Sequence, residues 1–166
     1  MNPLATEPFT ISRTMDASRD RVWNAFTNPK AMQHWWGPKG FAVTFQRMDF
    51  RPGGTYHYRL RSPDGKDLWG KFEYLEISKP ARLVWFNMFS DPQGGTTQHP
   101  LNPDWPTRMR TVVTFVEKDG KTVVTVQWTP IDASAAERET FEKGRSSMNQ
   151  GWSGTFEQLE AYLKSK

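Results

Sequence analysis

The feature of this sequence that most constrains its fold is a long stretch of strand-forming residues, from Phe41 to Pro130, followed by a helical pattern that continues nearly to the last residue. The stretch is rich in Val, Thr, Phe, Tyr and Trp, and clusters of Gly, Pro and Asp interrupt it at short intervals. Such interruptions are typical of hairpins between antiparallel strands. We therefore predict an antiparallel meander that buries one face against the helix that follows it.

The segment before the meander predicts one strand and two short helices. Apolar and polar residues alternate over residues 9–13, which is typical of a half-buried strand. Ser18 can cap a helix that stops at Asn28, because the residue before Pro29 disfavours the helical conformation. Pro29 suits the first position of a second short helix, which Gly37 closes.

The last hairpin of the meander has the most specific turn signal. Asp119-Gly120 is a preferred pair for a two-residue type I′ turn, and this turn fixes the register of the flanking strands. The opposed pairs are Phe115 with Val124, Val113 with Val126, and Thr111 with Trp128. We expect all of these side chains to face inward.

The hairpin around residues 63–66 is expected to place several aromatic rings on one face. A three-residue loop of Asp64-Gly65-Lys66 with a bulge would oppose Leu60 to Gly70, Tyr58 to Phe72, and Tyr56 to Tyr74. A two-residue loop would instead oppose Tyr58 to Lys71. We prefer the first register because it gathers the rings.

The sequence says less about the structure of the next strand and of the segment after it. The strand over residues 83–89 is apolar on both faces, so the sequence does not decide which of its side chains face inward. Alternation breaks at Tyr74-Leu75 in the preceding strand, which indicates a bulge. The segment from Asp91 to Pro106 is rich in Pro and Gly and predicts a long loop, which we place over the mouth of a cavity.

The C-terminal helix begins with a capping-box signature formed by Ser134 and Glu137. From Ala135 to Lys164 it would be about 45 Å long at about 1.5 Å per residue, enough to cross the sheet. Its expected apolar stripe consists of Phe141, Met148, Trp152, Thr155, Leu159 and Tyr162. Each of the glycines at 144, 151 and 154 costs about 1 kcal/mol relative to Ala, so we expect a bend or a close backbone approach there.

Several classes of protein are excluded by what the chain lacks. The sequence has no cysteine, which excludes disulfides, thiolate metal sites and a cysteine nucleophile. No apolar run is long enough for a membrane span, and residues 1–8 carry no secretory signal, so we expect a cytoplasmic protein. The formal net charge is only +4 and the basic residues are scattered, so we expect no nucleic-acid partner.

Catalytic and metal motifs are not convincing either. His34, His57 and His99 have no acidic residue at metal-ligand spacing, so we expect no metal. Residues 65–71 match a phosphate-loop pattern, but Phe72 stands where Ser or Thr is needed. Residues 151–154 lack the strand-to-helix context of a nucleophilic serine. We therefore assign no catalytic residue and no cofactor.

Aromatic residues are unusually abundant, with 8 Trp, 11 Phe and 4 Tyr. A strongly curved sheet around one helix is hard to fill, and a leftover volume of a few hundred Å³ is a common ligand site. The expected lining is Tyr56, Tyr58, Leu60, Phe72, Trp85, Asn87, Thr111, Val113, Val126, Trp128, Met148 and Trp152. The alternative, that Trp85, Trp128, Met148 and Trp152 interdigitate and close the cavity, stays open.

Short motifs in this order resemble the Aha1-like family, the bacterial relatives of the activator of Hsp90 ATPase within the SRPBCC superfamily. The resemblance covers about residues 8–164. The motifs that carry it are residues 21–29 (RVWNAFTNP), Trp35-Trp36-Gly37-Pro38, Arg51-Pro52-Gly53-Gly54, Pro63-Asp64-Gly65 and Gly151-Trp152. It implies an α+β helix-grip (START/Bet v 1-like) fold, with a curved antiparallel sheet of six to seven strands around a long C-terminal helix and two short helices after strand one.

We expect residues 1–166 to form a single domain, with 1–7 disordered, that binds a small hydrophobic or amphipathic molecule without a chemical step. The resemblance also implies an alternative, a co-chaperone of the Hsp90 type or another protein-interaction module, for which exposed Trp35, Trp36 or Trp105 could form the contact patch. A cyclase- or lyase-like enzyme is a further alternative, but no His, Asp or Glu falls on the predicted inward faces. The protein could be a monomer or a homodimer.

Overall fold

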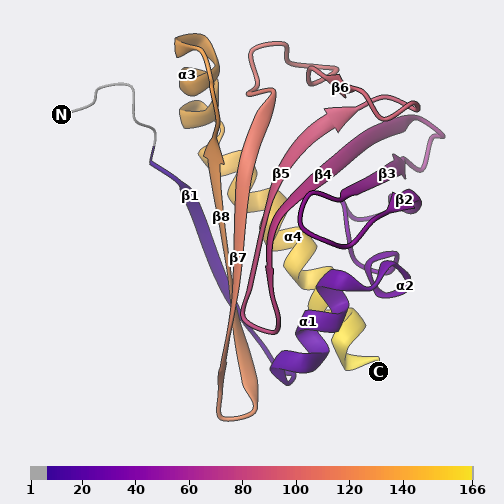
Figure 1. The fold of residues 1–166 in the computed structure, drawn as a ribbon, viewed down its shortest axis with the longest axis vertical. Coiled ribbons are helices and arrows are strands. Elements are labelled where there is room, and N and C mark those ends of the chain that lie inside the picture. Colours follow the sequence, from indigo (N-terminus) through magenta and orange to yellow (C-terminus); the bar gives the residue numbers. More distant parts are fainter. Residues whose placement is uncertain (1–6, 166) are drawn as a thin grey trace.

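One curved antiparallel sheet wraps around a long C-terminal helix (Figure 1). The structure is a computed structural model that describes residues 7–165. The strands are β1 (Phe9–Met15), β2 (Ala42–Met48), β3 (Thr55–Arg61), β4 (Asp67–Ser78), β5 (Arg82–Ser90), β6 (Thr96–Thr97), β7 (Arg108–Lys118) and β8 (Lys121–Pro130). The helices are α1 (Arg19–Thr27), α2 (Pro29–Met32), α3 (Ala135–Lys143) and α4 (Arg145–Lys164). The predicted α+β helix-grip fold is confirmed.

The sheet order is β1-β8-β7-β5-β4-β3-β2, with the two-residue β6 added beside β5. Strands β1 and β2 therefore lie at the two edges, and the chain passes from one edge to the other through α1 and α2. Strand β6 falls in the segment expected to be irregular, so the sheet has one more short strand than predicted. Residues 1–6, most of the segment predicted to be disordered, lie outside the described residues.

Helices α1 and α2 form where the sequence predicts. The Ser18 side chain accepts a hydrogen bond from the Arg21 N–H at 3.4 Å, and Asn28 then caps α2 by accepting from the Lys30 N–H at 3.1 Å. The second helix is shorter than expected, because α2 ends at Met32 and turns continue to Gly37, which has φ of 94°. These caps fix the sharp change of direction between the two helices.

The β7–β8 register is confirmed. Asp119 and Gly120 have φ of 55° and 77°, as a type I′ turn requires, and Phe115, Val113 and Thr111 lie opposite the predicted partners. These residues are buried, except Trp128, which is only partly buried. A two-residue loop leaves no freedom in the pairing, so the sequence determines it.

The predicted β3–β4 register is wrong by two residues. Leu60 lies opposite Leu68, Tyr58 opposite Gly70, and Tyr56 opposite Phe72. The loop has three residues, but they are Pro63-Asp64-Gly65, because the Ser62 N–H donates to the Lys66 carbonyl at 2.8 Å. Gly65 has φ of 87°, and a three-residue loop needs its left-handed residue in the last position, not the middle one. A shift of two keeps the same side chains on the same face.

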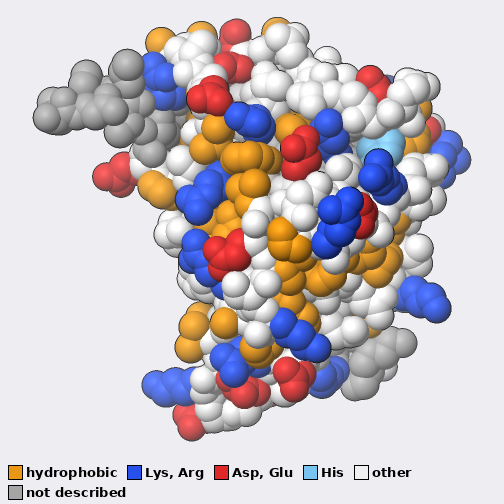
Figure 2. All heavy atoms as spheres, in the orientation of Figure 1, with side chains coloured by type: hydrophobic (Ala, Val, Ile, Leu, Met, Phe, Trp, Pro, Cys, Tyr) orange, Lys and Arg blue, Asp and Glu red, His pale blue; other side chains and the backbone are white. Residues whose placement is uncertain are grey.

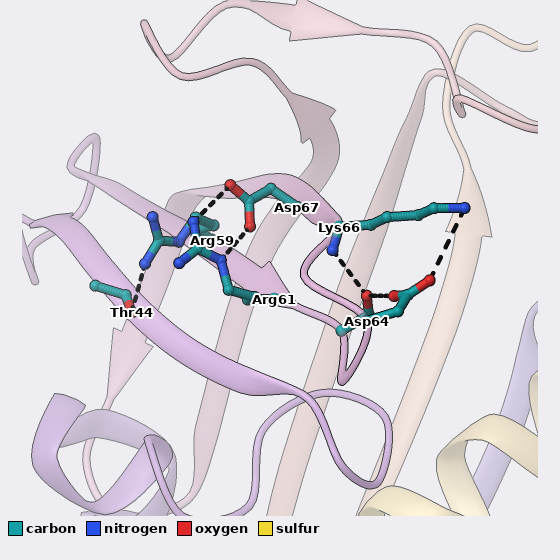
Figure 3. A network of polar contacts seen from close by, with 7 residues as sticks. Thr44, Arg59, Arg61, Asp64, Lys66 and Asp67 are labelled. Atoms are coloured by element: carbon teal, nitrogen blue, oxygen red, sulfur yellow. Dashed lines mark hydrogen bonds and ion pairs between the residues drawn. The ribbon is translucent and has the colours of Figure 1, made fainter.

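Polar contacts on the outer face hold this hairpin in register (Figure 3). Arg61 donates two hydrogen bonds to the Asp67 carboxylate, at 2.7 and 3.1 Å, and these two residues are the last opposed pair before the loop. Arg59 on the same face reaches Thr44 of β2 at 3.5 Å. Figure 2 shows a face of the molecule on which Lys and Arg side chains are interspersed with Asp and Glu, so this face has no continuous basic surface.

The bulge predicted at Tyr74-Leu75 is present, since the β4–β5 register shifts between Tyr74 and Glu76. The structure also determines the inward face of β5. Trp85 stacks on Phe72 at 4.5 Å between ring centroids, and Leu83 is fully buried. No helix of the described residues is long and apolar enough to cross a membrane.

The predicted C-terminal helix is divided at Gly144 into α3 and α4. A Cβ at Gly144 would lie 3.0 Å from the Trp105 ring, so a break and a close approach coincide there. Gly151 and Gly154 show neither a break in the helix nor a close approach. Helix α4 continues through both, and no atom lies within 4 Å of a Cβ added at either position.

The buried stripe of α4 differs from the predicted one at two positions. The buried residues are Met148, Trp152, Phe156, Leu159 and Leu163, whereas Thr155 and Tyr162 are only partly buried. The prediction was wrong at these positions because it followed three-residue steps from Trp152 and Leu159. The four-residue steps lead to Phe156 and Leu163.

Two alanine substitutions should separate backbone strain from packing. Neither Gly65 nor Gly154 has an atom within 4 Å of an added Cβ, but only Gly65 has a positive φ, 87°. Gly65→Ala should therefore lower the free energy of unfolding by about 1–2 kcal/mol, and Gly154→Ala should raise it by up to about 1 kcal/mol. Urea unfolding measures both, and shifts in the same direction would contradict this account.

Candidate functional site

A cavity of about 750 Å³ lies between the sheet and the N-terminal half of α4. Its sheet wall comes from β3, β4, β5, β7 and β8, and its helix wall from α3 and α4. The turn at residues 36–38 and residues 99–107 line the remaining sides. The helix wall consists of Thr140, Lys143, Gly144, Ser147, Met148, Gly151, Trp152 and Thr155.

Aromatic rings cover the sheet wall, in part because β4 carries a glycine opposite a tyrosine. Gly70 pairs with Tyr58, and a Cβ at Gly70 would lie 2.5 Å from the Tyr58 hydroxyl oxygen. The absence of a side chain at Gly70 therefore lets the Tyr58 ring lie close to the β4 backbone. Phe72 and Trp85 continue this wall with their stacked rings.

Trp36 connects the sheet wall to the helix wall. Its ring makes edge-to-face contacts with Phe72 at 5.2 Å, Trp152 at 5.9 Å and Tyr58 at 6.3 Å between centroids. Trp152 in turn contacts Trp128 at 5.7 Å. Edge-to-face pairs of this kind hold large rings in defined orientations. These contacts therefore fix the positions of the rings that form the aromatic wall.

The segment from Asp91 to Pro106 covers one side of the cavity, as expected. Its first turn is held on the outer face of the sheet, because His57 Nε2 lies 2.9 Å from the Asp91 carbonyl oxygen and Lys71 Nζ donates to the Gly94 carbonyl at 3.1 Å. Four residues of the segment line the cavity: His99, Asn102, Trp105 and Pro106.

The polar side chains of the cavity are mainly uncharged. Burial raises the pKa of Tyr58 to about 12, although a hydrogen bond with the Trp36 side chain partly opposes this rise. Burial also lowers the pKa of His99, so its imidazole is neutral near pH 7. Thr111 donates a hydrogen bond to the Asn87 side-chain oxygen. The indole N–H of Trp152 is buried and has no hydrogen-bond partner among residues 7–165.

Eight of the twelve residues expected to bind a ligand line the cavity. They are Tyr58, Leu60, Phe72, Trp85, Asn87, Trp128, Met148 and Trp152. The other four, Tyr56, Thr111, Val113 and Val126, are buried but lie outside the lining. The cavity occupies only one end of the sheet, and at the other end α1 covers β7, where Phe26 packs on Phe115 at 5.1 Å. Tyr56 instead donates to the Met32 sulfur at 3.1 Å.

The cavity also contains residues that the sequence analysis did not place there. His99 lies in its lining, although no histidine falls on the predicted inward strand faces. Trp36 and Trp105 line it too and are partly buried, while Trp35 is 1% exposed and donates to the Ala25 carbonyl at 3.0 Å. These tryptophans therefore do not form the exposed contact patch considered above.

A signal for the helix wall was present in the sequence. Gly144, Ser147, Gly151 and Thr155 recur at intervals of three and four, so these small residues share one face of α4. Small side chains on a helix that faces a curved sheet leave volume unfilled. Within residues 7–165, no group of three His, Cys, Asp or Glu residues is placed to hold a metal ion.

Comparisons with known proteins agree with this architecture. A model of the family described as "Activator of Hsp90 ATPase homolog 1-like protein" matches residues 16–164. The chain belongs to this family. A search of curated proteins gives no match.

Among solved structures of similar fold, the protein Ms6760 from Mycobacterium smegmatis is 25% identical, with a TM-score of 0.76, and the match covers 96% of this chain and 92% of that one. A protein from Arthrobacter aurescens is 25% identical, with a TM-score of 0.81 and coverage of 97% and 88%. A protein from Staphylococcus epidermidis is 25% identical, with a TM-score of 0.75 and coverage of 96% and 91%. The fold of this Hsp90-activator-like protein is thus shared over nearly its whole length.

The raised pKa of Tyr58 predicts how stability depends on pH. An ordinary tyrosine titrates near 10, so the unfolded chain loses this proton at lower pH than the folded protein does. The neutral Tyr58 phenol therefore stabilises the fold fully below pH 10, and this contribution is lost as the pH rises to about 12. The free energy of unfolding should fall less steeply over this interval in Tyr58→Phe than in the wild type. Equal slopes in urea unfolding at a series of pH values would contradict the assignment.

Proposed function

We propose that residues 1–166 act as one domain that binds a small hydrophobic or amphipathic molecule in the cavity between the sheet and α4, without a chemical step. The observation that carries this proposal is the cavity of about 750 Å³ with aromatic walls. Small-molecule sites in proteins typically enclose about 300–1,000 Å³ and are lined by apolar and aromatic side chains with a few polar groups. This cavity has both properties.

A glycine on α4 supports the same proposal. Gly151 lies within α4, where a glycine costs about 1 kcal/mol relative to alanine, and it lines the cavity. The space beside Gly70 and Gly144 is taken by the rings of Tyr58 and Trp105, whereas Gly151 has no such neighbour. Larger residues at Gly151 would meet no atom within 4 Å at their Cβ, so packing alone does not require a glycine there. Space for a ligand explains its presence.

Water in contact with the aromatic rings of the cavity finds few hydrogen-bond partners on them, so an apolar group that displaces this water is favoured. An apolar ligand that buries roughly 200 Å² would gain about 5 kcal/mol at about 25 cal/mol per Å², before the cost of association. The cavity is large enough for such a ligand. A gain of about 5 kcal/mol corresponds to a Kd of roughly 0.2 mM, so we expect sub-millimolar or weaker binding for simple apolar probes of this size and tighter binding for the natural ligand.

A matched pair of glycine substitutions on α4 tests this function. Gly151 lines the cavity and Gly154 does not, and neither has an atom within 4 Å of an added Cβ. Gly151→Phe should fill part of the cavity and weaken the binding of N-phenyl-1-naphthylamine at least 10-fold. Gly154→Phe should leave its affinity unchanged. Fluorescence titration measures both.

The two variants share the gain in helix propensity, so a loss of binding in Gly151→Phe alone cannot come from altered stability of α4. Absence of saturable binding to the wild type across a panel of fluorescent apolar probes would overturn the proposed function. Equal affinities of the wild type and Gly151→Phe would show that the probe binds elsewhere, with the same consequence.

A further inference from the structure

The cavity has an unequal supply of hydrogen-bond donors and acceptors. No described residue that lines it is acidic, and Lys143 is its one charged side chain. Lys143 is 76% exposed and pairs with Glu139 at 3.0 Å, so it lies at the rim. The inner part therefore depends on neutral polar groups, whose free hydrogens and lone pairs can be counted one by one.

Trp152 provides a donor that has no acceptor. Its side chain is 5% exposed, and its indole N–H is buried with no hydrogen-bond partner among the described residues. An indole nitrogen can only donate. Buried polar groups without partners are rare in native proteins because they lose their hydrogen bonds to water. An acceptor on a bound molecule would satisfy this group.

Tyr58 and Asn87 provide two more donors on the sheet wall. The Tyr58 hydroxyl lies beside the backbone of Gly70 and donates to no residue that the structure describes, so its hydrogen stays available. The Asn87 side-chain oxygen accepts from Thr111, which leaves the Asn87 Nδ2 hydrogens without a partner among the described residues. Both side chains line the cavity.

His99 adds a donor from the covering segment. Its Nδ1 accepts a hydrogen bond from the Leu101 N–H at 3.0 Å, so the proton of the neutral ring is on Nε2. The hydroxyls of Thr140 and Thr155 offer acceptors to the cavity instead of donors. They donate to the carbonyls of Ala136 and Gly151, at 2.9 and 3.1 Å, and their free lone pairs lie on the helix wall.

We propose that the cavity selects apolar molecules whose polar atoms are hydrogen-bond acceptors, such as the oxygen of a ketone, ester or lactone, held by the free hydrogens of Tyr58, Asn87 and Trp152. This inference rests on the proposed function and specifies its ligand class. A carbonyl oxygen has two lone pairs and can accept from two of these groups at once. A ligand that presents an ammonium group there would place a positive charge beside the hydrogens of Asn87 and Trp152, with no acidic side chain among the described lining residues to pair with it.

Three naphthalene probes test the inference by competition with N-phenyl-1-naphthylamine. 2-Acetylnaphthalene and 2-isopropenylnaphthalene have nearly the same shape and differ in a C=O and a C=CH₂ group. The ketone should bind about 10-fold more tightly, as expected for one net hydrogen bond. The cation of 1-(2-naphthyl)ethylamine should bind at least 10-fold more weakly than the alkene.

Matched variants test which side chains donate a hydrogen bond to the ketone oxygen. Tyr58→Phe and Trp152→Phe each remove one donor but keep a ring, so each should reduce the ratio of the ketone affinity to the alkene affinity, even where the changed wall shifts both affinities together. Tyr56→Phe and Trp23→Phe make the same changes at buried positions outside the lining, and they should keep the full preference. The affinity for the alkene also reports whether each variant retains the folded cavity.

The outcomes separate this inference from the proposed function. If the alkene binds as tightly as the ketone, or more tightly, the ligand class is wrong while the binding function stands. If the preference persists in both Tyr58→Phe and Trp152→Phe, the assignment to these donors is overturned. If none of the three probes displaces N-phenyl-1-naphthylamine and the dye itself does not bind saturably, the proposed function fails as well.

Discussion

Helix α4 packs tightly against the curved sheet in its C-terminal half and borders a cavity in its N-terminal half, and the rest of the structure depends on this difference. Phe156, Leu159 and Leu163 are at most 5% exposed and fill the end of the sheet near α1. Toward the other end, Ser147 and Gly151 leave space that no side chain fills. A straight helix cannot follow a curved sheet closely along its whole length, so one end packs tightly while the other encloses a cavity.

The two halves of α4 have different roles: the C-terminal half packs against the sheet, and the N-terminal half borders the cavity. The packed end contains the fully buried pairs of β7 and β8 and the rings of α1, such as Phe26 on Phe115. At the cavity end, Trp36 joins the two walls through edge-to-face contacts with Phe72 and Trp152. Several lining residues, among them Phe72, Trp85 and Trp152, also belong to the hydrophobic core. The walls of the cavity are therefore held by the same packing that stabilises the fold.

The sequence determines the structure best where a short turn sets the geometry. Asp119-Gly120 permits one register, and the β7–β8 pairing follows from it. The β3–β4 register was predicted wrongly because the loop was centred on Gly65, whereas a three-residue loop places its left-handed residue last. His99 and Trp105 could not be placed, since a loop has no periodicity to show which side chains turn inward. The lining residues on strands were mostly predicted, but where the cavity ends along the sheet depends on how far α1 reaches.

The most direct test is to follow the tryptophan indole N–H signals by NMR during titration with 2-acetylnaphthalene. The chain has 8 Trp, and the variants Trp152→Phe, Trp36→Phe and Trp23→Phe assign the three signals that matter. The signals of Trp152 and Trp36 should shift saturably, while that of Trp23, which packs on Phe115 at the closed end, should stay in place. Unchanged Trp152 and Trp36 signals at saturating ligand, or a shift confined to Trp23, would contradict a binding site between α4 and the sheet.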